Sequence, residues 1–267
     1  MLTLERQEKI KDMLLENKTV QVAELSDLFK VSFETIRRDL KVLEKEGFAE
    51  KTYRGAVLIE KVSHKASYQV LSHIMVETKR KLAEAAAAFI DEGDCIYIDF
   101  STTCGQMVYT IPDVQINVLT SSLAVINALK DKEKISLLTT GGMWDKNNYA
   151  FMGLAAAQNL KQFHVDKAFI SCRGLSIEHG LSDRTEDEAS IRSIIIENAN
   201  EVFLLADESK FDKDAFVKTG DLKRVTTVIT DKKTDARWTE FFRNNNIRCI
   251  DGHLLESGKW KNSSLWL

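Results

Sequence analysis

The sequence predicts an α/β chain of two domains: a small N-terminal domain of helices with a β-hairpin, and a larger domain built on a mostly parallel sheet. Three observations predict this class. The chain has 267 residues, more than one typical domain. Two short amphipathic helices joined by a tight turn lie before residue 45. After residue 75, short apolar runs alternate with helical segments, as in parallel sheets that helices cover on both faces. We expect domains at 1–59 and 75–267, with a polar linker at 60–74.

The composition and charge are ordinary for a soluble globular protein. The chain is 44% hydrophobic and 29% charged, which is ample material for a core. The formal net charge is −3, so the total charge gives no sign of an acidic partner such as a nucleic acid. Residues 30–54 are locally basic, with seven Lys and Arg against five Asp and Glu. Any affinity for nucleic acid must therefore depend on where these charges point.

The cysteines and histidines form no pattern typical of a metal site or a disulfide framework. The four cysteines are far apart with no C-x-x-C pair, and the five histidines lack metal-ligand spacing. We interpret Cys104 as a small side chain that fills space. The N-terminus has no apolar signal core, and no apolar stretch approaches ~18 residues. We therefore expect a cytoplasmic protein with no metal, no cofactor and no membrane span.

A helix-turn-helix is predicted in the first domain, after a helix at 4–17. Apolar residues recur at helical spacing in 22–28 and again in 36–43, and the turn at 29–31 is short. Ser32 stands where an N-cap belongs, because its hydroxyl can accept a backbone N–H from the first turn of the helix that follows. The apolar positions of the pair are Val22, Leu25, Leu28, Ile36, Leu40 and Leu43.

The exposed side of the later helix and the hairpin behind it suit double-stranded DNA. In a helix-turn-helix the second helix enters the major groove, where arginine and polar side chains contact base edges and phosphates. Gly47 is predicted to end this helix, and 48–59 to form a two-stranded wing whose tip reaches backbone phosphates or the minor groove. The candidate DNA contacts are Ser32, Phe33, Glu34, Thr35, Arg37, Arg38, Lys41, Lys51 and Arg54.

The larger domain is predicted to alternate helices and strands. A long helix at 75–91 leads into a strand at 95–100, and the same alternation continues to residue 250. Sheets of this kind usually bind ligands at the carboxyl ends of their strands. The other predicted strands are 116–119, 135–138, 168–171, 202–205, 225–229 and 247–250, and the helices are 122–130, 152–162, 186–199 and 235–246.

Hydroxyls, glycines and cations follow successive strands of this predicted sheet. Asp99 begins a loop in which Ser101, Thr102 and Thr103 open a helix, where free N–H groups and the positive dipole end suit a phosphate. The alternative is that one hydroxyl merely caps the helix; three in a row favour a ligand loop. The same residue types recur at later strand ends, as Ser121, Ser122, Gly141, Gly142, Arg173 and Lys210. Together they predict a site for a small phosphorylated, polyhydroxylated ligand.

The chain resembles the DeoR family of bacterial transcriptional regulators over almost its whole length. The residues of the first domain that match are Val31, Ser32, Thr35, Ile36, Arg37, Arg38, Asp39, Leu40, Leu43, Glu44 and Gly47. Those of the second domain include Lys79, Leu82, Asp99, Ser101, Thr102, Thr103, Ser122, Gly141, Gly142, Gly153, Asp166, Gly180, Asp207, Ser209, Lys210 and Phe211.

The resemblance implies a sensor domain similar in fold to ribose-5-phosphate isomerase and CoA transferases, with a sugar phosphate as effector. It implies DNA contacts at Arg37 and Arg38. Ser101 and Cys104 stand close to the pattern of members that sense deoxyhexulose phosphates, such as those of fucose and rhamnose. The effector contacts that the resemblance implies are Ser101, Thr102, Thr103, Ser122, Gly142, Asp183 and Lys210.

The leading hypothesis is a DNA-binding regulator that represses a carbohydrate-utilisation operon until a phosphorylated sugar binds. It would act as a homo-oligomer, a dimer or a tetramer, on a palindromic or repeated operator, and activation stays open. The alternative from another class is a sugar-phosphate isomerase with an accessory winged helix, for which Asp99, Asp183 or Asp207 would be the general base. A third hypothesis is a protein-interaction module, which the acidic balance of 1–60 permits and the pair of Arg37 and Arg38 disfavours.

Overall fold

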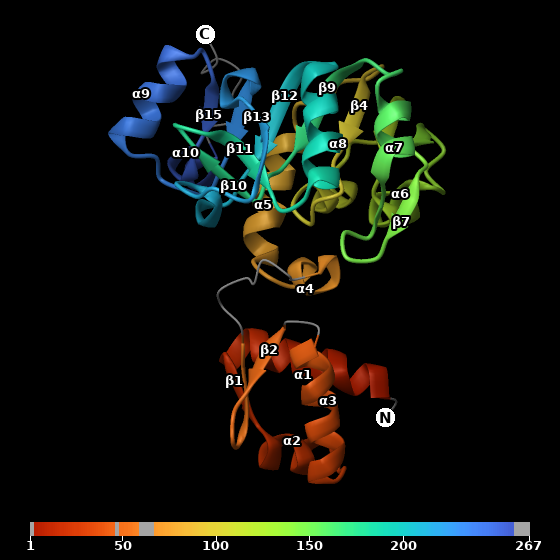
Figure 1. The fold of residues 1–267 in the computed structure, drawn as a ribbon, viewed down its shortest axis with the longest axis vertical. Coiled ribbons are helices and arrows are strands. Elements are labelled where there is room, and N and C mark those ends of the chain that lie inside the picture. Colours follow the sequence, from red (N-terminus) through yellow and green to blue (C-terminus); the bar gives the residue numbers. More distant parts are fainter. Residues whose placement is uncertain (1–2, 46–47, 59–66, 259–267) are drawn as a thin grey trace. The chain divides into compact units, whose positions relative to one another are not determined.

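The protein is described from a computed structural model, in which residues 3–45, 48–58 and 67–258 are described (Figure 1). The chain divides into two compact units, Met1–Ile74 and Met75–Leu267, here called the N-terminal and the C-terminal unit. The predicted helix end at Gly47 and residues 59–66 of the predicted wing and linker lie outside the described residues. Each unit has its own hydrophobic core.

The N-terminal unit is a helix-turn-helix with a small antiparallel sheet. Its elements are α1 (Thr3–Asn17), β1 (Thr19–Gln21), α2 (Val22–Phe29), α3 (Phe33–Lys45), β2 (Ala49–Lys51), β3 (Gly55–Leu58) and α4 (Tyr68–Ser72). The three helices and the hairpin lie where the sequence predicts them. β1 was not predicted, because its one apolar residue, Val20, stands between Thr19 and Gln21 and gives no apolar run. α4 lies within the segment that was predicted to be a linker.

The core of this unit contains the predicted apolar stripe of α3. Leu28 is an exception to the predicted pattern, because it is 58% exposed on α2. The turn between α2 and α3 is held by Lys30, which adopts a left-handed conformation (φ 54°), and by the Ser26 hydroxyl, which donates to the Val31 carbonyl at 2.6 Å. The fully buried residues include Ile10, Leu14, Leu25, Ile36, Leu40 and Leu43.

The wing sheet has the order β1-β3-β2 and depends on one glycine. A Cβ atom added to Gly55 would lie 1.8 Å from the carbonyl oxygen of Val20, far inside van der Waals contact. Only glycine therefore allows β3 to approach β1 this closely. Because β1 connects α1 to α2, the wing is paired with the chain of the helix-turn-helix itself.

A parallel sheet of seven strands, in the order β15-β14-β12-β9-β4-β5-β6, forms the centre of the described part of the C-terminal unit. Its strands are β4 (Cys95–Ile98), β5 (Ile116–Thr120), β6 (Ile135–Thr139), β9 (Val165–Ile170), β12 (Ala199–Leu205), β14 (Thr227–Ile229) and β15 (Arg248–Ile250). All seven were predicted. The fold class inferred from the sequence is therefore confirmed.

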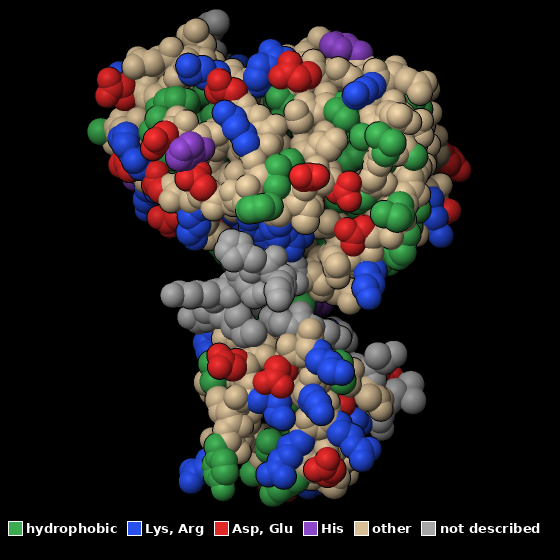
Figure 2. Space-filling model, in the orientation of Figure 1, with side chains coloured by type: hydrophobic (Ala, Val, Ile, Leu, Met, Phe, Trp, Pro, Cys, Tyr) green, Lys and Arg blue, Asp and Glu red, His purple; other side chains and the backbone are tan. Residues whose placement is uncertain are grey.

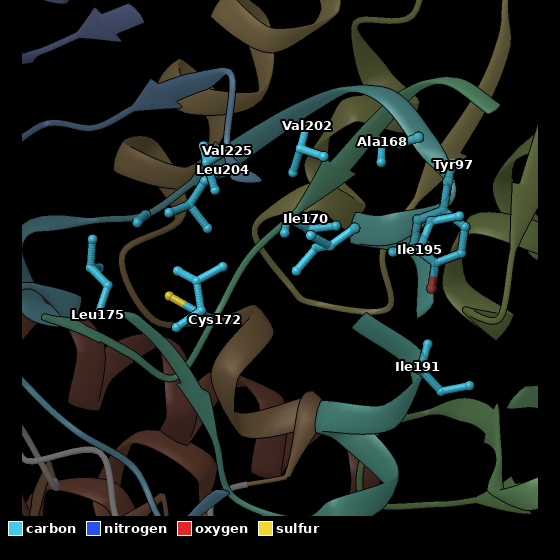
Figure 3. Close-up of a cluster of buried hydrophobic side chains, with 14 of the residues drawn as sticks. Tyr97, Ala168, Ile170, Cys172, Leu175, Ile191, Ile195, Val202, Leu204 and Val225 are labelled. Carbon is cyan, nitrogen blue, oxygen red and sulfur yellow. The ribbon is translucent and has the colours of Figure 1, made fainter. Parts of the chain in front are cut away.

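Helices cover both faces of this sheet. Along β4 the side chains alternate, so that Tyr97 packs on one face while Ile96 and Ile98 pack on the other. Figure 3 shows the first face, where Tyr97 and its neighbours on β9 and β12 lie beside Ile191 and Ile195 of α8. That face packs against α7 (Gly153–Leu160), α8 (Glu186–Glu197) and α9 (Ala236–Asn244), and the other against α5 (Val76–Ala87), α6 (Leu123–Leu129) and α10 (Gly252–Ser257).

Two small antiparallel sheets also occur among the described residues of the C-terminal unit, and neither was predicted. One is the hairpin β7 (Met143–Asp145) and β8 (Ala150–Met152); the other joins β10 (Gly174–Ser176), β11 (Gly180–Asp183) and β13 (Val217–Gly220). Their strands have three or four residues each, and all but β8 include polar residues or glycine, so they give no apolar run in the sequence. The β10-β11-β13 sheet matters for the site because Asp183 lies on β11.

Candidate functional site

The outward side of α3 presents basic and polar side chains. Ser32 caps the helix, because its Oγ accepts a hydrogen bond from the backbone N–H of Thr35 at 3.2 Å. Arg37 and Arg38 are exposed, and the Arg38 guanidinium lies 4.0 Å from the Glu34 carboxylate. An exposed pair this long is weak, so it leaves both arginines available to phosphates or base edges. Phe33, Glu34 and Lys41 are also exposed, and Thr35 is half-buried.

The tip of the wing adds two exposed cations to this unit. Lys51 and Arg54 are both exposed, and Tyr53 between them is 95% exposed. Figure 2 shows Lys and Arg side chains gathered over α3 in the N-terminal unit. The local basic character noted in 30–54 therefore belongs largely to exposed side chains, although the unit as a whole is not basic.

The inner side of α3 is fixed to α1 by a buried polar network. Asp39 is 2% exposed and accepts hydrogen bonds from Arg6 Nε at 2.6 Å and from Gln7 Nε2 at 2.9 Å. Arg6 and Asp39 form a buried ion pair. The sequence matched Asp39 to the family pattern without giving it a role; its position shows that it orients the helix that carries Arg37 and Arg38.

In the C-terminal unit, the loop after β4 differs from the prediction in one respect. The segment after Thr103 is a 3-10 helix, η1 (Cys104–Tyr109), and not an α-helix, so the predicted helix-dipole contribution is small. Ser101 Oγ accepts the backbone N–H of Cys104 at 3.1 Å, which is the capping role left open above. Thr102 and Thr103 are buried beside it. Burial raises the pKa of the Cys104 thiol well above its ordinary value, so this cysteine is not an activated thiolate.

The hydroxyls after β5 separate into two roles. Ser122 Oγ caps α6 by accepting the backbone N–H of Val125 at 3.4 Å. Ser121 is fully buried, and its Oγ and the Oη of Tyr97 form no well-shaped hydrogen bond with the described residues, although the two hydroxyls lie close enough for Ser121 to act on the pKa of Tyr97. Burial raises the pKa of Tyr97, so its phenol stays protonated and able to donate. A buried polar atom without a partner is costly, which makes Ser121 and Tyr97 notable among the hydroxyls at this end of the sheet.

The two glycines after β6 have a packing reason of their own. Gly142 has a φ of 113°, and a Cβ there would lie 2.6 Å from the Met152 carbonyl oxygen and 2.8 Å from the Ala156 Cβ. Gly141 has a φ of 60°. The close approach predicted for a ligand is therefore, at Gly142, an approach of the backbone to β8 and α7.

Two predicted effector carboxylates are bridged by Arg192 of α8. Its guanidinium donates to Asp99 from Nη2 at 3.0 Å and from Nε at 3.2 Å, and to Asp183 from Nη1 at 2.5 Å. All three side chains are buried. Asp183 also accepts the Thr219 hydroxyl at 2.7 Å and the backbone N–H of Arg173 at 3.1 Å, yet burial outweighs these partners and raises its pKa. Arg192 thus joins the end of β4 to β11.

Cations lie beside this bridge, at the ends of β9 and β12. Lys210 Nζ is 3.8 Å from the Asp207 carboxylate, and Asp207 is 2% exposed. Burial, and after it the nearby charge of Arg184, lower the pKa of Arg173 to about 10. Burial, together with the charges of Lys210 and Arg173, also lowers the pKa of Lys79, in the first turn of α5, to about 7.

Several predicted residues therefore converge, and others do not. Asp99, Asp183 and Arg173 are linked through hydrogen bonds, and Lys210 acts electrostatically on the same region. Gly141 and Gly142 follow β6, the edge strand two places from β4. The sequence missed the role of Arg192. The signal for Arg192 was its position, four residues after Glu188 and three before Ile195, on the buried side of α8.

No helix in the described ranges is both long enough and apolar enough to cross a membrane.

Known protein families match both units. Residues 6–62 match the DeoR-like helix-turn-helix domain, and residues 74–232 match the DeoR C terminal sensor domain. Both models describe parts of transcriptional regulators, so the alternative of an isomerase is not supported. The ion pairs of Asp99 and Asp183 with Arg192 agree with this, because a carboxylate held by an arginine is a poor general base.

Relatives share nearly the full length of the chain. The uncharacterized HTH-type transcriptional regulator YulB of Bacillus subtilis (strain 168) is 36% identical over 93% of this chain and 96% of that protein. The HTH-type transcriptional repressor GlcR of the same organism is 30% identical, over 92% of this chain and 95% of that protein. The L-fucose operon activator of Escherichia coli (strain K12) is 31% identical, over 86% and 96%.

Among solved structures, ribose 5-phosphate isomerase A of Methanocaldococcus jannaschii is similar at 19% identity over 51% of this chain and 54% of that chain, with a TM-score of 0.38. A similarity this low supports no argument about function. The two family models, together with relatives that are similar from the helix-turn-helix through the sensor domain, show that the chain belongs to the DeoR family of DNA-binding transcriptional regulators.

Proposed function

We propose that this regulator represses a carbohydrate-utilisation operon in the bacterial cytoplasm, where the chromosome lies, and that a phosphorylated sugar of that pathway releases it from DNA. The observation that carries the proposal is the combination of two features in one chain. Exposed Arg37 and Arg38 lie on a capped recognition helix, and in the sensor domain Lys210 lies 3.8 Å from the Asp207 carboxylate while Arg173 donates its backbone N–H to Asp183. Cations of this kind suit a phosphate, and the adjacent hydroxyls suit a sugar.

The candidate contacts divide by chemistry. On α3 and the wing, the arginines and lysines would contact phosphates and base edges of double-stranded DNA. In the sensor domain, Lys210 and Arg173 would bind the effector's phosphate, while Ser121, whose Oγ lies beside the Tyr97 phenol, would hydrogen-bond a sugar hydroxyl. Ser101, Ser122, Asp99, Asp183 and Gly142 would shape the site, since their side chains or backbone are committed to the contacts described above.

A homo-oligomer is part of the proposal. A helix-turn-helix reads one half-site, and two copies separated by about one helical turn of DNA read a palindrome. Two relatives act in opposite senses by their names, one as a repressor and one as an operon activator. Repression is proposed for this chain, and activation is the result that the experiment below distinguishes from it.

The test is fluorescence anisotropy of the full chain with labelled DNA from upstream of its own gene and of neighbouring sugar-use genes. Random DNA at the same salt concentration is the reference, because the electrostatic part of binding depends on salt. The titration is repeated with inorganic phosphate, glucose 6-phosphate, rhamnulose 1-phosphate and fuculose 1-phosphate. Arg37→Ala is compared with Arg80→Ala, an exposed arginine of α5 in the other unit.

The expected result is specific binding that one sugar phosphate weakens and that Arg37→Ala, but not Arg80→Ala, reduces. Specific binding that a sugar phosphate strengthens would replace repressor release with effector-dependent binding. Binding that never exceeds that to random DNA, with or without each compound, would contradict the proposal.

A further inference from the structure

The hairpin of β7 and β8 carries a cluster of aromatic side chains on its surface. The Trp144 ring packs edge-on against the rings of Tyr149 and Phe151, with centroids 5.2 Å and 5.8 Å apart. None of the three belongs to either hydrophobic core of the described part of the C-terminal unit. The cluster therefore lies on the outside of the domain, and Trp144 is 43% exposed.

More apolar surface lies beside this cluster. Met143 is 68% exposed, and Leu154, the second residue of α7, is 74% exposed. The hairpin and the start of α7 are adjacent, because a Cβ atom added to Gly153 would lie 3.9 Å from the Cβ of Met143. Figure 2 shows hydrophobic side chains on the surface over α7 and β7. Large apolar side chains exposed together are typical of a surface that another molecule covers.

The segment that forms this surface is nearly without charge. Between Leu137 and Leu160 the only charged residues are Asp145 and Lys146, although 29% of the chain is charged. The two are adjacent and opposite in sign, so the surface has no net charge. DNA and anionic membranes select clusters of cations, which this surface lacks. A low content of charge together with aromatic residues and Met is typical of the centre of a protein–protein interface.

β7 is the outer strand of the hairpin. Among the described residues it pairs only with β8, whose other side is bridged to Ser122. The backbone N–H of Phe151 donates to the Ser121 carbonyl at 2.8 Å, away from β7. Trp144 is opposite Phe151, so the two are a non-hydrogen-bonded pair and Trp144 directs its own N–H and C=O toward the open edge. An open edge without proline or a bulge is a template for another strand.

We propose that β7 is the contact between two copies of this chain, in which the two β7 strands pair antiparallel around Trp144. This inference rests on the homo-oligomer of the proposed function and assigns its contact surface. A twofold axis brings the same surface of both copies together, and two identical strands that it relates across an edge run antiparallel. With the axis at Trp144, the two copies of this residue exchange both backbone hydrogen bonds, N–H to C=O.

The charges and the shape of the hairpin agree with this pairing. Asp145 of one copy lies opposite Met143 of the other, so no like charges are directly opposed. The two indoles lie side by side, because residues directly opposite one another point to the same face of a sheet. The hairpin is also fixed to the domain, since the N–H of Leu123 donates to the Tyr149 carbonyl at 3.0 Å. A preformed edge loses little conformational entropy when it pairs.

The test is sedimentation velocity of the full chain without DNA, over a range of protein concentrations. Trp144→Lys and Trp144→Glu each place like charges opposite one another across the twofold axis, whereas an equimolar mixture of the two brings opposite charges together. Trp144→Phe keeps an aromatic ring at this position. Phe216→Lys is the matched control, because Phe216 is 91% exposed elsewhere in the same unit. Circular dichroism melting curves establish that each variant is folded.

Wild type, Trp144→Phe and Phe216→Lys are expected to associate with similar affinity. Trp144→Lys and Trp144→Glu should each associate about tenfold more weakly or less, because a twofold interface contains the substitution twice. Their mixture should regain association. Hydrogen exchange of wild type gives a second measurement that needs no substitution: the N–H of Trp144 should become protected as the protein concentration rises through the dissociation constant.

Two results would overturn the inference, and they differ in what else they affect. If the folded charged variants associate as wild type does, or if their mixture regains nothing, β7 does not face a second β7, and an oligomer through another surface still stands. If wild type stays monomeric at every concentration, both the β7 contact and the homo-oligomer of the proposed function fail. Should the charged variants not fold, exchange at Trp144 that is independent of concentration overturns the inference. Operator binding is measured separately by anisotropy.

Discussion

Arg192 donates two hydrogen bonds to Asp99, at 3.0 Å and 3.2 Å, and both side chains are buried. Their pairing ties α8 to the end of β4, and the remaining donor of Arg192 reaches Asp183 on β11. The contact changes how Asp99 should be understood. Its carboxylate stabilises the structure around the site, so substitutions of Asp99 should lower the stability of the domain first and affect effector binding only as a consequence.

The first prediction concerns this bridge. Arg192→Met should destabilise the sensor domain by about 3–5 kcal/mol, because it leaves Asp99 and Asp183 as neighbouring buried carboxylates without a cation. Adding Asp99→Asn to Arg192→Met should recover part of the loss, since one buried charge disappears. Urea unfolding measures both. If the free energy of unfolding of Arg192→Met lies within about 0.5 kcal/mol of wild type, the structural role of the bridge is contradicted.

The second prediction concerns the recognition helix. Arg37→Ala and Arg38→Ala should each weaken operator binding, by about 1–3 kcal/mol if the arginine contacts a base. Replacing an arginine that contacts a base should also reduce the discrimination between the operator and random DNA. Replacing an arginine that contacts a phosphate should weaken binding to both DNAs alike and reduce the salt dependence of binding. Anisotropy titrations over a range of salt concentrations separate the two, and full affinity in both variants would exclude α3 as the contact.

The third prediction concerns Asp39. Asp39→Ala should destabilise the N-terminal unit by about 3–5 kcal/mol, because Arg6 and Gln7 lose a buried acceptor. A domain of about 60 residues has little stability in reserve, so operator binding should fall with it. Hydrogen exchange should show faster exchange in α1 and α3 with the sensor domain unchanged. Glu34→Ala, an exposed carboxylate on the same helix, is the control for stability.

The fourth prediction concerns the pH dependence of stability. The pKa of Lys79 is lowered from 10.5 to about 7 in the folded state, so the unfolded chain binds more protons between these values. The cost of the buried ammonium is fully present below about pH 7 and is relieved as the pH rises toward 10. Relative to Lys79→Met, wild type should gain up to roughly 1.4 kcal/mol per pH unit above pH 7, in buffers without phosphate or sulfate. If the free energies of unfolding of wild type and Lys79→Met change in parallel with pH, the lowered pKa of Lys79 is contradicted.

Much of the fold was readable from the sequence because its elements repeat a simple period. The stripe of Ile36, Leu40 and Leu43 predicted α3 and its buried side, and all three residues are fully buried. The strands of the parallel sheet are apolar on both faces, so they stand out as short continuous runs. β1 and the strands of the β10-β11-β13 sheet include polar residues and glycine and form no continuous apolar run, and for that reason they were missed.

The site was predictable by residue type and not by role. Hydroxyls and cations at strand ends were visible, but hydrogen-bond geometry decides whether Ser101 or Ser122 caps a helix or faces a ligand. The role of Arg192 was missed because helical periodicity predicts that a side chain is buried without identifying its partners. One partner of Arg192, Asp99, is distant in the sequence, and only the folding of the chain brings the two side chains together.

The two sides of α3 have different roles, one in folding and one in DNA binding. The inner side is held by Asp39 and the apolar stripe, which tolerate little change. The outer side, with Arg37, Arg38 and Lys41, makes no contribution to the buried core. Substitutions there can alter the preferred DNA sequence while leaving the domain folded. A duplicated copy of such a gene is therefore free to acquire a new operator through a few outward-facing changes, and regulators of separate pathways can diverge on one unchanged scaffold.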